Sequence, residues 1–173
     1  MTISTLARSE LVERAVDEHY GELFAFLYRR LGNRHDAEDV LQTVFLRFAS
    51  SQMCFWGKKQ LRAYLYRIAV NCANDHFRSR AARLSFEEAA AKDTSLDTPM
   101  TEPSEDGEMR SRVQRALMAL PEPSREVLLL RYFAELKPKE IALCLETDAK
   151  TVNNRLYAAK QQFKKEWTNN GNE

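Results

Sequence analysis

Glycine, proline and cysteine are all scarce in this chain of 173 residues. Five glycines and five prolines exclude collagen-like and low-complexity chains, and the shortage of turn-forming residues favours helices. The three cysteines, Cys54, Cys72 and Cys144, have no CxxC spacing, so they indicate neither a disulfide framework nor a zinc site. No stretch approaches the roughly 18 apolar residues of a membrane span, and the first residues lack the apolar run of a signal peptide. We therefore expect a cytoplasmic protein without stable membrane insertion.

Catalytic motifs are missing as well. The histidines His19, His35 and His76 are scattered, and the sequence contains neither a GxxxxGK[ST] loop nor an HExxH pair. We expect a protein that is not an enzyme, has no catalytic residues, and needs no metal and no cofactor.

Charge is distributed unevenly along the chain although its net value is only +1. Residues 1–83 and residues 109–173 each carry a net charge of +4, whereas residues 84–108 hold eight acids and one lysine. Turn-forming pairs such as Asp-Gly also occur in this acidic segment. We therefore expect two small domains, at residues 1–83 and 109–173, joined by a flexible acidic linker at residues 84–108.

Apolar residues recur with helical spacing in both basic blocks. In the first block the pattern predicts helices over residues 11–31, 36–50 and 61–80, with Tyr20 on the buried stripe and Gly32 as a left-handed cap. In the second block a helix runs through residue 133 with Ser124 as its N-cap. It is followed by a short helix that starts at Pro138 and a long basic helix over residues 150–167. Two helices joined by a short turn are typical of a helix-turn-helix.

Several of these stretches resemble bacterial sigma factors. LGNRHDAEDVLQ (31–42), followed by FLR (45–47), resembles the second conserved region, and YLYRIAVN (64–71) with Asp75 and Arg78 is similar to later parts of the same domain. ALP (119–121), REV (125–127), EIA (140–142) and the TV and RL pairs of the last helix are similar to the sigma-four domain. The order of these motifs resembles the extracytoplasmic-function sigma factors. The resemblance implies an all-α protein, a sigma-two helical bundle joined to a sigma-four helix-turn-helix, that directs promoter-specific initiation.

The resemblance also implies partners and a polymerase-binding helix. In the family, residues matching Asp39 and Gln42 bind the β′ clamp of core RNA polymerase, and their spacing puts them on one helix face. Asp36 and Glu38 are further candidates, and Thr43 stands where the family usually has an acid. The other implied partners are the β flap of the polymerase, double- and single-stranded promoter DNA, and an anti-sigma factor.

Promoter melting is the role that the resemblance implies for the rest of the first domain. Phe55 matches an aromatic that helps to enclose a flipped base, and Asn71 matches an amide that faces it; aromatic stacking and amide pairing suit unpaired bases. Phe55 and Trp56 are alternatively packed beneath their loop. The full set of candidates for the downstream element is Phe55, Trp56, Arg62, Tyr64, Arg67, Asn71, Arg78 and Arg80.

Recognition of the upstream element is expected from the last helix, whose first turns enter the major groove in such domains. The candidates are Thr151, Asn153, Asn154, Arg155, Tyr157 and Lys160. Glu135 and Glu146 stand where relatives often have glycine, and Ala158 stands where some relatives have a base-contacting arginine. Two other classes remain open from sequence: a sigma-mimicking protein that sequesters an anti-sigma factor, and a dimeric helix-turn-helix repressor or activator.

Overall fold

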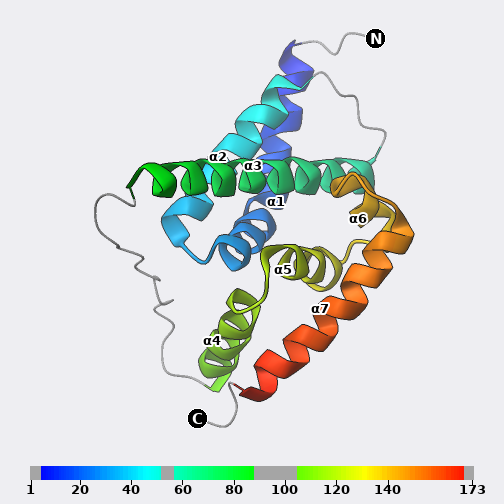
Figure 1. The fold of residues 1–173 in the computed structure, drawn as a ribbon. Helices are drawn as coiled ribbons and strands as arrows, with labels where there is room; N and C mark the ends of the chain where they lie inside the picture. The colour runs from blue at the N-terminus through cyan, green and yellow to red at the C-terminus, as the bar shows by residue number, and fades with distance from the viewer. Residues whose placement is uncertain (1–4, 52–56, 88–104, 170–173) are drawn as a thin grey trace.

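The computed structural model describes residues 5–51, 57–87 and 105–169 of the chain. In these residues the backbone forms seven α-helices and a short π-helical segment, and it forms no strand. Figure 1 shows two groups of helices packed on each other, with α3 lying across α1 and α2 and with α4 to α7 gathered along one side. The expectation of an all-α protein built from two helical units is confirmed.

The first unit consists of α1 (Thr5–Leu31), α2 (Arg34–Ser50) and α3 (Lys58–Glu87). The predicted end of α1 is correct, because Gly32 has φ +77° and its N–H donates to the Tyr28 carbonyl at 2.9 Å. Helix α2 begins two residues earlier than predicted, because the Asn33 side chain accepts a hydrogen bond from the Asp36 N–H at 3.0 Å and caps the helix.

The core of the first unit lies where the three helices cross. Phe26 of α1 and Tyr66 of α3 are fully buried and meet edge to face, with ring centroids 5.2 Å apart. Tyr20, which the apolar spacing placed on the buried stripe, is instead 48% exposed, so that prediction was wrong. Its ring stacks on Phe24 of α1 and Phe45 of α2, with ring centroids 6.4 Å apart in each pair, and both of these rings are only partly buried.

The second unit consists of α4 (Glu105–Met118), α5 (Glu122–Leu128), the π-helical segment η1 (Leu129–Phe133), α6 (Pro138–Cys144) and α7 (Ala149–Asn169). The prediction that Ser124 caps α5 was wrong. The helix already begins at Glu122, and Pro123 fits its first turn because an N–H at that position needs no partner in the helix. Pro138 opens α6 as predicted.

Helices occupy both ends of the predicted acidic linker. Helix α3 continues to Glu87, and α4 starts at Glu105, in a stretch to which the sequence pattern assigned no helix. Acids and Gly107 dominate the first turn of α4, so its apolar periodicity begins only near Val113. The unpredicted helix thus enlarges the second unit at the expense of the linker.

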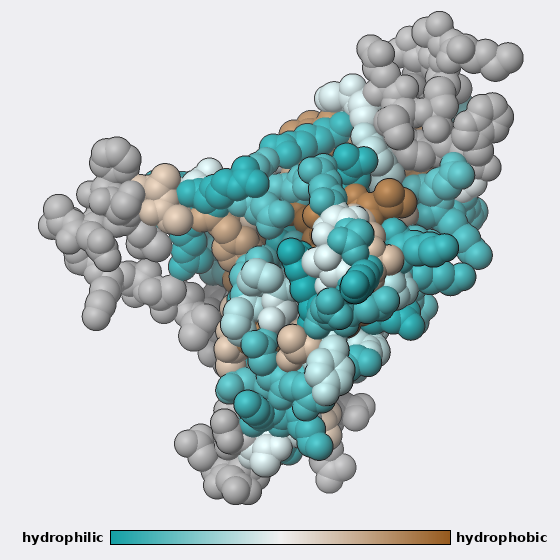
Figure 2. Space-filling view, turned by 45° about the vertical axis from the view of Figure 1, so that its right-hand side comes forward, coloured by the Kyte–Doolittle hydropathy of each residue, from teal (hydrophilic) through white to brown (hydrophobic). Residues whose placement is uncertain are grey.

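One continuous apolar core runs through both units. Helix α3 packs against α6, and α1 packs against α4, α5 and η1. The face drawn in Figure 2 is largely hydrophilic, with apolar residues confined to small areas. Within the described ranges, none of the helices combines the length and the apolar character that crossing a bilayer requires.

Candidate polymerase and nucleic-acid interface

The exposed side of α2 carries the first group of candidate residues. The Asp39 side chain is 62% exposed, and Gln42 lies exposed on the same side one turn later. Leu46 continues this row and is 69% exposed, although it is large and apolar. The Thr43 hydroxyl donates to the Asp39 carbonyl at 3.1 Å, so this residue adds no charge to the row. An acid, an amide and an exposed leucine on one helix side form a surface suited to a protein partner.

The two other candidates on α2 are engaged elsewhere. The Asp36 carboxylate faces α3, where it lies 3.4 Å from His76 Nε2 and 3.6 Å from Arg80 Nη1. Glu38 accepts a hydrogen bond from Arg34 at 2.9 Å. Arg80, a candidate for DNA, is therefore held against Asp36 of α2.

A second row of side chains follows one side of α3. The row has one residue per helical turn, at three- to four-residue spacing, which aligns the side chains along the helix. Its members are Tyr64, Arg67, Asn71, Asp75 and Arg78. Arg67, Asn71 and Arg78 are exposed, and Tyr64 is half-buried with its ring edge toward Phe48. Cations, an amide and an aromatic in a single row provide the groups that hold phosphates and unpaired bases.

Asp75 balances part of the charge in this row. Its carboxylate accepts hydrogen bonds from Arg47 of α2 at 2.8 Å and from Arg78 at 3.3 Å. The hydrogen bond to Asp75 raises the pKa of Arg47 above its ordinary value. Arg47, which the sequence analysis did not consider as a DNA contact, thus stands beside the α3 row.

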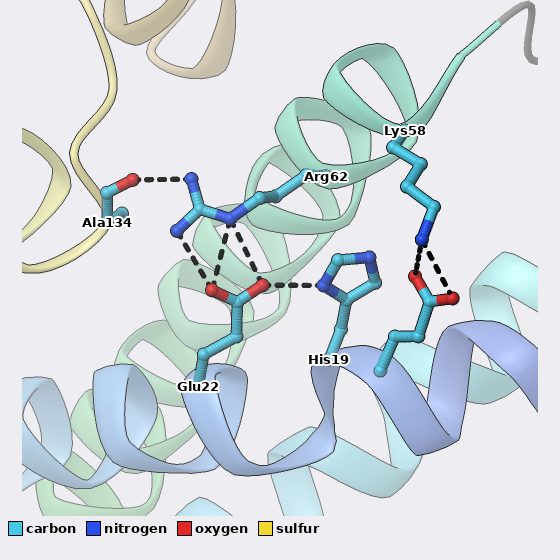
Figure 3. A network of polar contacts seen from close by, with 6 residues as sticks. His19, Glu22, Lys58, Arg62 and Ala134 are labelled. Carbon is cyan, nitrogen blue, oxygen red and sulfur yellow. Dashed lines mark hydrogen bonds and ion pairs between the residues drawn. The ribbon is translucent and has the colours of Figure 1, made fainter.

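Arg62 points to a different side of α3 from Arg67 and Asn71. Figure 3 shows its guanidinium clamped on the Glu22 carboxylate, with Nη2 to Oε2 at 2.8 Å, while Nη1 donates to the Ala134 carbonyl of the second unit at 2.7 Å. His19 lies on the other side of the same carboxylate, 2.6 Å away. Burial raises the pKa of Glu22, but hydrogen bonds from Arg62 and His19 outweigh it, so the net shift is downward. The structure therefore does not bring Arg62 together with the exposed row of α3.

The start of α7 carries the third group. Asp148 caps the helix by accepting hydrogen bonds from the Thr151 N–H at 2.8 Å and from its hydroxyl at 2.7 Å, which lower the pKa of Asp148. Asn153, Asn154 and Arg155 are exposed in the next turn. Val152, Leu156 and Ala159 are buried at helical spacing on the opposite side. The exposed residues can thus face a DNA groove without disturbing the core.

The last two candidates on α7, Tyr157 and Lys160, point to different sides of the helix. Tyr157 is 70% exposed and continues the polar side. Lys160 instead holds its ammonium 5.3 Å from the centroid of the Tyr132 ring, at the edge of a cavity of about 410 Å³. Lys160 therefore belongs to the cavity more than to the exposed start of α7.

The cavity lies between α4, η1 and α7 and is lined mainly by apolar side chains. Its lining includes Val113, Leu117, Leu129, Tyr132, Phe133 and Phe163. Arg29 of α1 contributes the other cation at its edge, with its guanidinium 4.3 Å from the Phe133 ring centroid. This cavity can accept an apolar segment of a partner protein, and Arg29 and Lys160 can pair with an acidic side chain of that segment.

The loop aromatics and the cysteines are the remaining residues for which the sequence analysis stated an expectation. Phe55 and Trp56 lie outside the described residues. Cys72 and Cys144 are free and buried, and burial raises the pKa of the Cys144 thiol to about 12. In the described part of the chain, no cluster of His, Cys, Asp and Glu side chains could hold a metal ion.

The sequence patterns predicted neither the exposure of Leu46 nor the burial of Arg30. Leu46 stands between Phe45 and Arg47 in the motif FLR, and only its exposure distinguishes it from a core residue. Arg30 is completely buried and contacts the second unit. The spacing offered a signal here, because Arg30 lies seven residues after Leu23 and three after Leu27, which are both core residues of α1.

Comparisons with known proteins agree with this arrangement. The family model for Sigma-70 region 2 matches residues 15–83, and the model for Sigma-70, region 4 matches residues 110–163. The ECF RNA polymerase sigma factor SigW of Bacillus subtilis is 28% identical over 87% of this chain and 86% of its own length. The RNA polymerase sigma factor YlaC of the same organism is 28% identical over 91% of this chain and 92% of its own.

A solved structure has the same fold. It is the sigma factor RpoE in complex with the anti-sigma factor NepR from Bartonella quintana, which superposes with a TM-score of 0.75 over 90% of this chain and 96% of that chain at 16% identity. The two family matches together span both helical units, and the two relatives align with this chain over most of their own length. The chain therefore belongs to the sigma-70 family as an extracytoplasmic-function sigma factor, an alternative sigma factor that directs transcription initiation by RNA polymerase.

Proposed function

We propose that the exposed row on α2 is the surface that binds the β′ clamp of core RNA polymerase. The observation that carries this proposal is the exposure of Asp39, Gln42 and Leu46 on one side of the helix. Asp39 supplies charge, Gln42 supplies hydrogen bonds, and Leu46 supplies apolar area to a partner. Thr43 removes one acid from this surface relative to the family pattern, so Leu46 takes a larger share of the contact here.

The DNA contacts divide between the two units. The row of Tyr64, Arg67, Asn71 and Arg78 on α3 receives the separated strand of the downstream element, with Asn71 at a base edge and the arginines on phosphates. Phe55 and Trp56 stack on the bases of that strand. The exposed turn of α7, from Asn153 to Tyr157, reads the upstream element in the major groove, where an asparagine can pair with adenine in two hydrogen bonds.

The apolar cavity of the second unit is the site we assign to the polymerase β flap. Its apolar lining suits a hydrophobic segment, and Arg29 and Lys160 flank it. An anti-sigma factor is a further partner, supported by the solved relative whose complex contains one. These partners place the protein in the cytoplasm, where it acts by binding and catalyses no reaction of its own.

Polymerase binding is tested with the double variant Asp39→Arg, Gln42→Ala. Charge reversal and loss of an amide should weaken binding to core polymerase by about 2–4 kcal/mol, measured by fluorescence anisotropy of the labelled sigma factor. Asp17→Arg is the matched control, because it makes the same charge reversal at an exposed acid of α1 rather than of α2. Equal affinity of the double variant and the control would refute the assignment.

Promoter melting is tested separately, with Asn71→Ala and Phe55→Ala. Both variants should lose transcription from duplex promoters and keep most of it on a template that is already open around the start site. Ser79→Ala, an exposed change on the same helix, is the control. A loss of the same size on both templates would show that these residues do not act in melting.

A further inference from the structure

The apolar cavity of the second unit has the size and the lining of a small-molecule site. Its volume is about 410 Å³, and side chains of α4, α5, η1 and α7 form its walls. Pockets that enclose one small molecule have roughly 300–1,000 Å³ and are lined mainly by apolar side chains. The rim reaches water at Tyr132, which is 56% exposed, so a ligand can enter from solvent.

Apolar residues on α4 and α7 extend this cavity along the two helices. On α4, Val113 and Leu117 line the cavity, and Met109, one turn before Val113, is 53% exposed on the same side. On α7, Phe163 lines the cavity and stacks on Trp167, with ring centroids 6.0 Å apart. The two helices are in contact and approach each other in Figure 1. An apolar track between two helices suits an unbranched alkyl chain better than a compact polar molecule.

Cations from three helices surround the same cavity. Arg29 of α1 and Lys160 of α7 belong to its lining, which contains no acid. The π-helical segment η1 presents two consecutive rings to them. Lys160 lies 5.3 Å from the centroid of Tyr132, and Arg29 lies 4.3 Å from that of Phe133. Burial, and after it the charge of Arg110 on α4, lower the pKa of Arg29, so a nearby anion would be stabilised.

The guanidinium of Arg29 is half-buried and mostly unpaired. Its Nη1 donates to the Ala25 carbonyl at 3.2 Å. Among the residues that the structure describes, no carboxylate pairs with Arg29, and its other N–H groups have no hydrogen-bond acceptor. Charged groups that leave water are normally paired, and a guanidinium can bind a carboxylate through two parallel hydrogen bonds. Arg29 is therefore suited to hold the acidic head of a ligand whose tail fills the cavity.

We propose that the cavity binds an unbranched fatty acid, with the alkyl chain along the track between α4 and α7 and the carboxylate at Arg29 and Lys160. The chain buries apolar surface, and the carboxylate supplies the negative charge that the rim lacks. The β flap segment that we assign to this cavity occupies the same space, so the fatty acid and the flap exclude each other. Only this competition rests on the proposed function, because the acid binds to the chain without polymerase.

Binding is measured by isothermal titration calorimetry of the full chain with dodecanoate below its micelle concentration. Dodecyltrimethylammonium, which has the same chain length and the opposite charge, should bind at least about tenfold more weakly. The double variant Arg29→Gln, Lys160→Gln should lose about tenfold in affinity for dodecanoate and should not lose affinity for the cationic probe. Its matched control is Arg83→Gln, Lys165→Gln, which removes the same charge at exposed positions of α3 and α7.

Val113→Trp tests the apolar part of the site, because its indole ring fills the cavity and should abolish the binding of dodecanoate. Equal affinity of the Arg29→Gln, Lys160→Gln variant and its control would overturn the proposal. Uptake of many dodecanoate molecules per chain would also overturn it, because adsorbed detergent behaves in this way.

Core polymerase separates the fatty acid from the flap. Saturating dodecanoate should weaken the binding of the labelled chain to core polymerase and should not weaken that of Val113→Trp further. If Val113→Trp weakens polymerase binding and the unaltered chain binds no dodecanoate, the flap assignment holds and the fatty-acid site fails. If dodecanoate binds as expected but neither it nor Val113→Trp changes polymerase binding, the fatty-acid site holds and the flap assignment fails.

Discussion

Glu126 makes the stability of this protein depend on pH in an unusual direction. Its side chain is buried between the units, where it pairs with Arg30 of α1 and also senses the charges of Glu122 on its own helix and Arg155 of α7. Burial raises the pKa of Glu126 from 4.5 to about 7, although Arg30 attracts the ionised form. The native state therefore holds this proton more tightly than any state in which the carboxyl reaches water.

The sign and size of the effect follow from that difference. Because the native pKa lies above the unfolded value, protonation stabilises the native state, and this contribution is complete at acidic pH and lost as pH rises through about 7. Between pH 5 and pH 8 the loss should be about 2–3 kcal/mol, since each pKa unit corresponds to about 1.4 kcal/mol. Glu22, whose pKa is lowered, titrates below this window and does not oppose the change.

The assay is urea unfolding of the unaltered chain and of Glu126→Gln at pH 5, 6, 7 and 8. Glutamine resembles the protonated carboxyl, so the two proteins should be about equally stable at pH 5, and the variant should be more stable by about 2–3 kcal/mol at pH 8. Taking the difference between the two proteins cancels the titration of every other group. A difference that stays constant from pH 5 to pH 8 would refute the reasoning, because it would mean that Arg30 keeps Glu126 ionised throughout.

Three further predictions concern the backbone and the cap of α7. Gly32→Ala should lower the free energy of unfolding by about 1–2 kcal/mol in urea unfolding, because alanine is disfavoured at φ +77° and its Cβ would lie 2.6 Å from Met118 Cε. Gly21→Ala is the control and should not destabilise the chain, because the space around Gly21 is open. Glu135→Gly should raise stability by up to about 1 kcal/mol by relieving the left-handed backbone, and a loss instead would show that its side chain stabilises the fold. Asp148→Ala should lower helicity and upstream-promoter affinity together; unchanged circular dichroism and binding would contradict the importance of this cap.

Local chemistry explains which parts of the fold could be read in advance. The left-handed end of α1 at Gly32, the start of α6 at Pro138 and the buried stripe of α7 each depend on residues within one or two turns. The predicted start of α5, with Ser124 as the N-cap, was too late. Pro123 and Ser124 both favour the beginning of a helix, and only the surrounding packing decides that the first helical residue is Glu122. Helix α4 was missed because its first turn is polar and its apolar side is completed by α1 and α7.

The sequence by itself determined the helical class, the two units and the family, because periodicity and short motifs are carried by neighbouring residues. It also predicted outward-facing positions for Asp39, Gln42, Asn71 and Asn153, which are all exposed, because polar residues opposite an apolar stripe of a helix face the solvent. Their roles in binding stay predictions. Only the tertiary structure decided that Arg62 faces Glu22 and Ala134, that Arg67 meets Glu146, and that Arg30 is buried against α5. These contacts join residues 40 to 96 positions apart, and the charge of an arginine does not specify which distant acid will meet it.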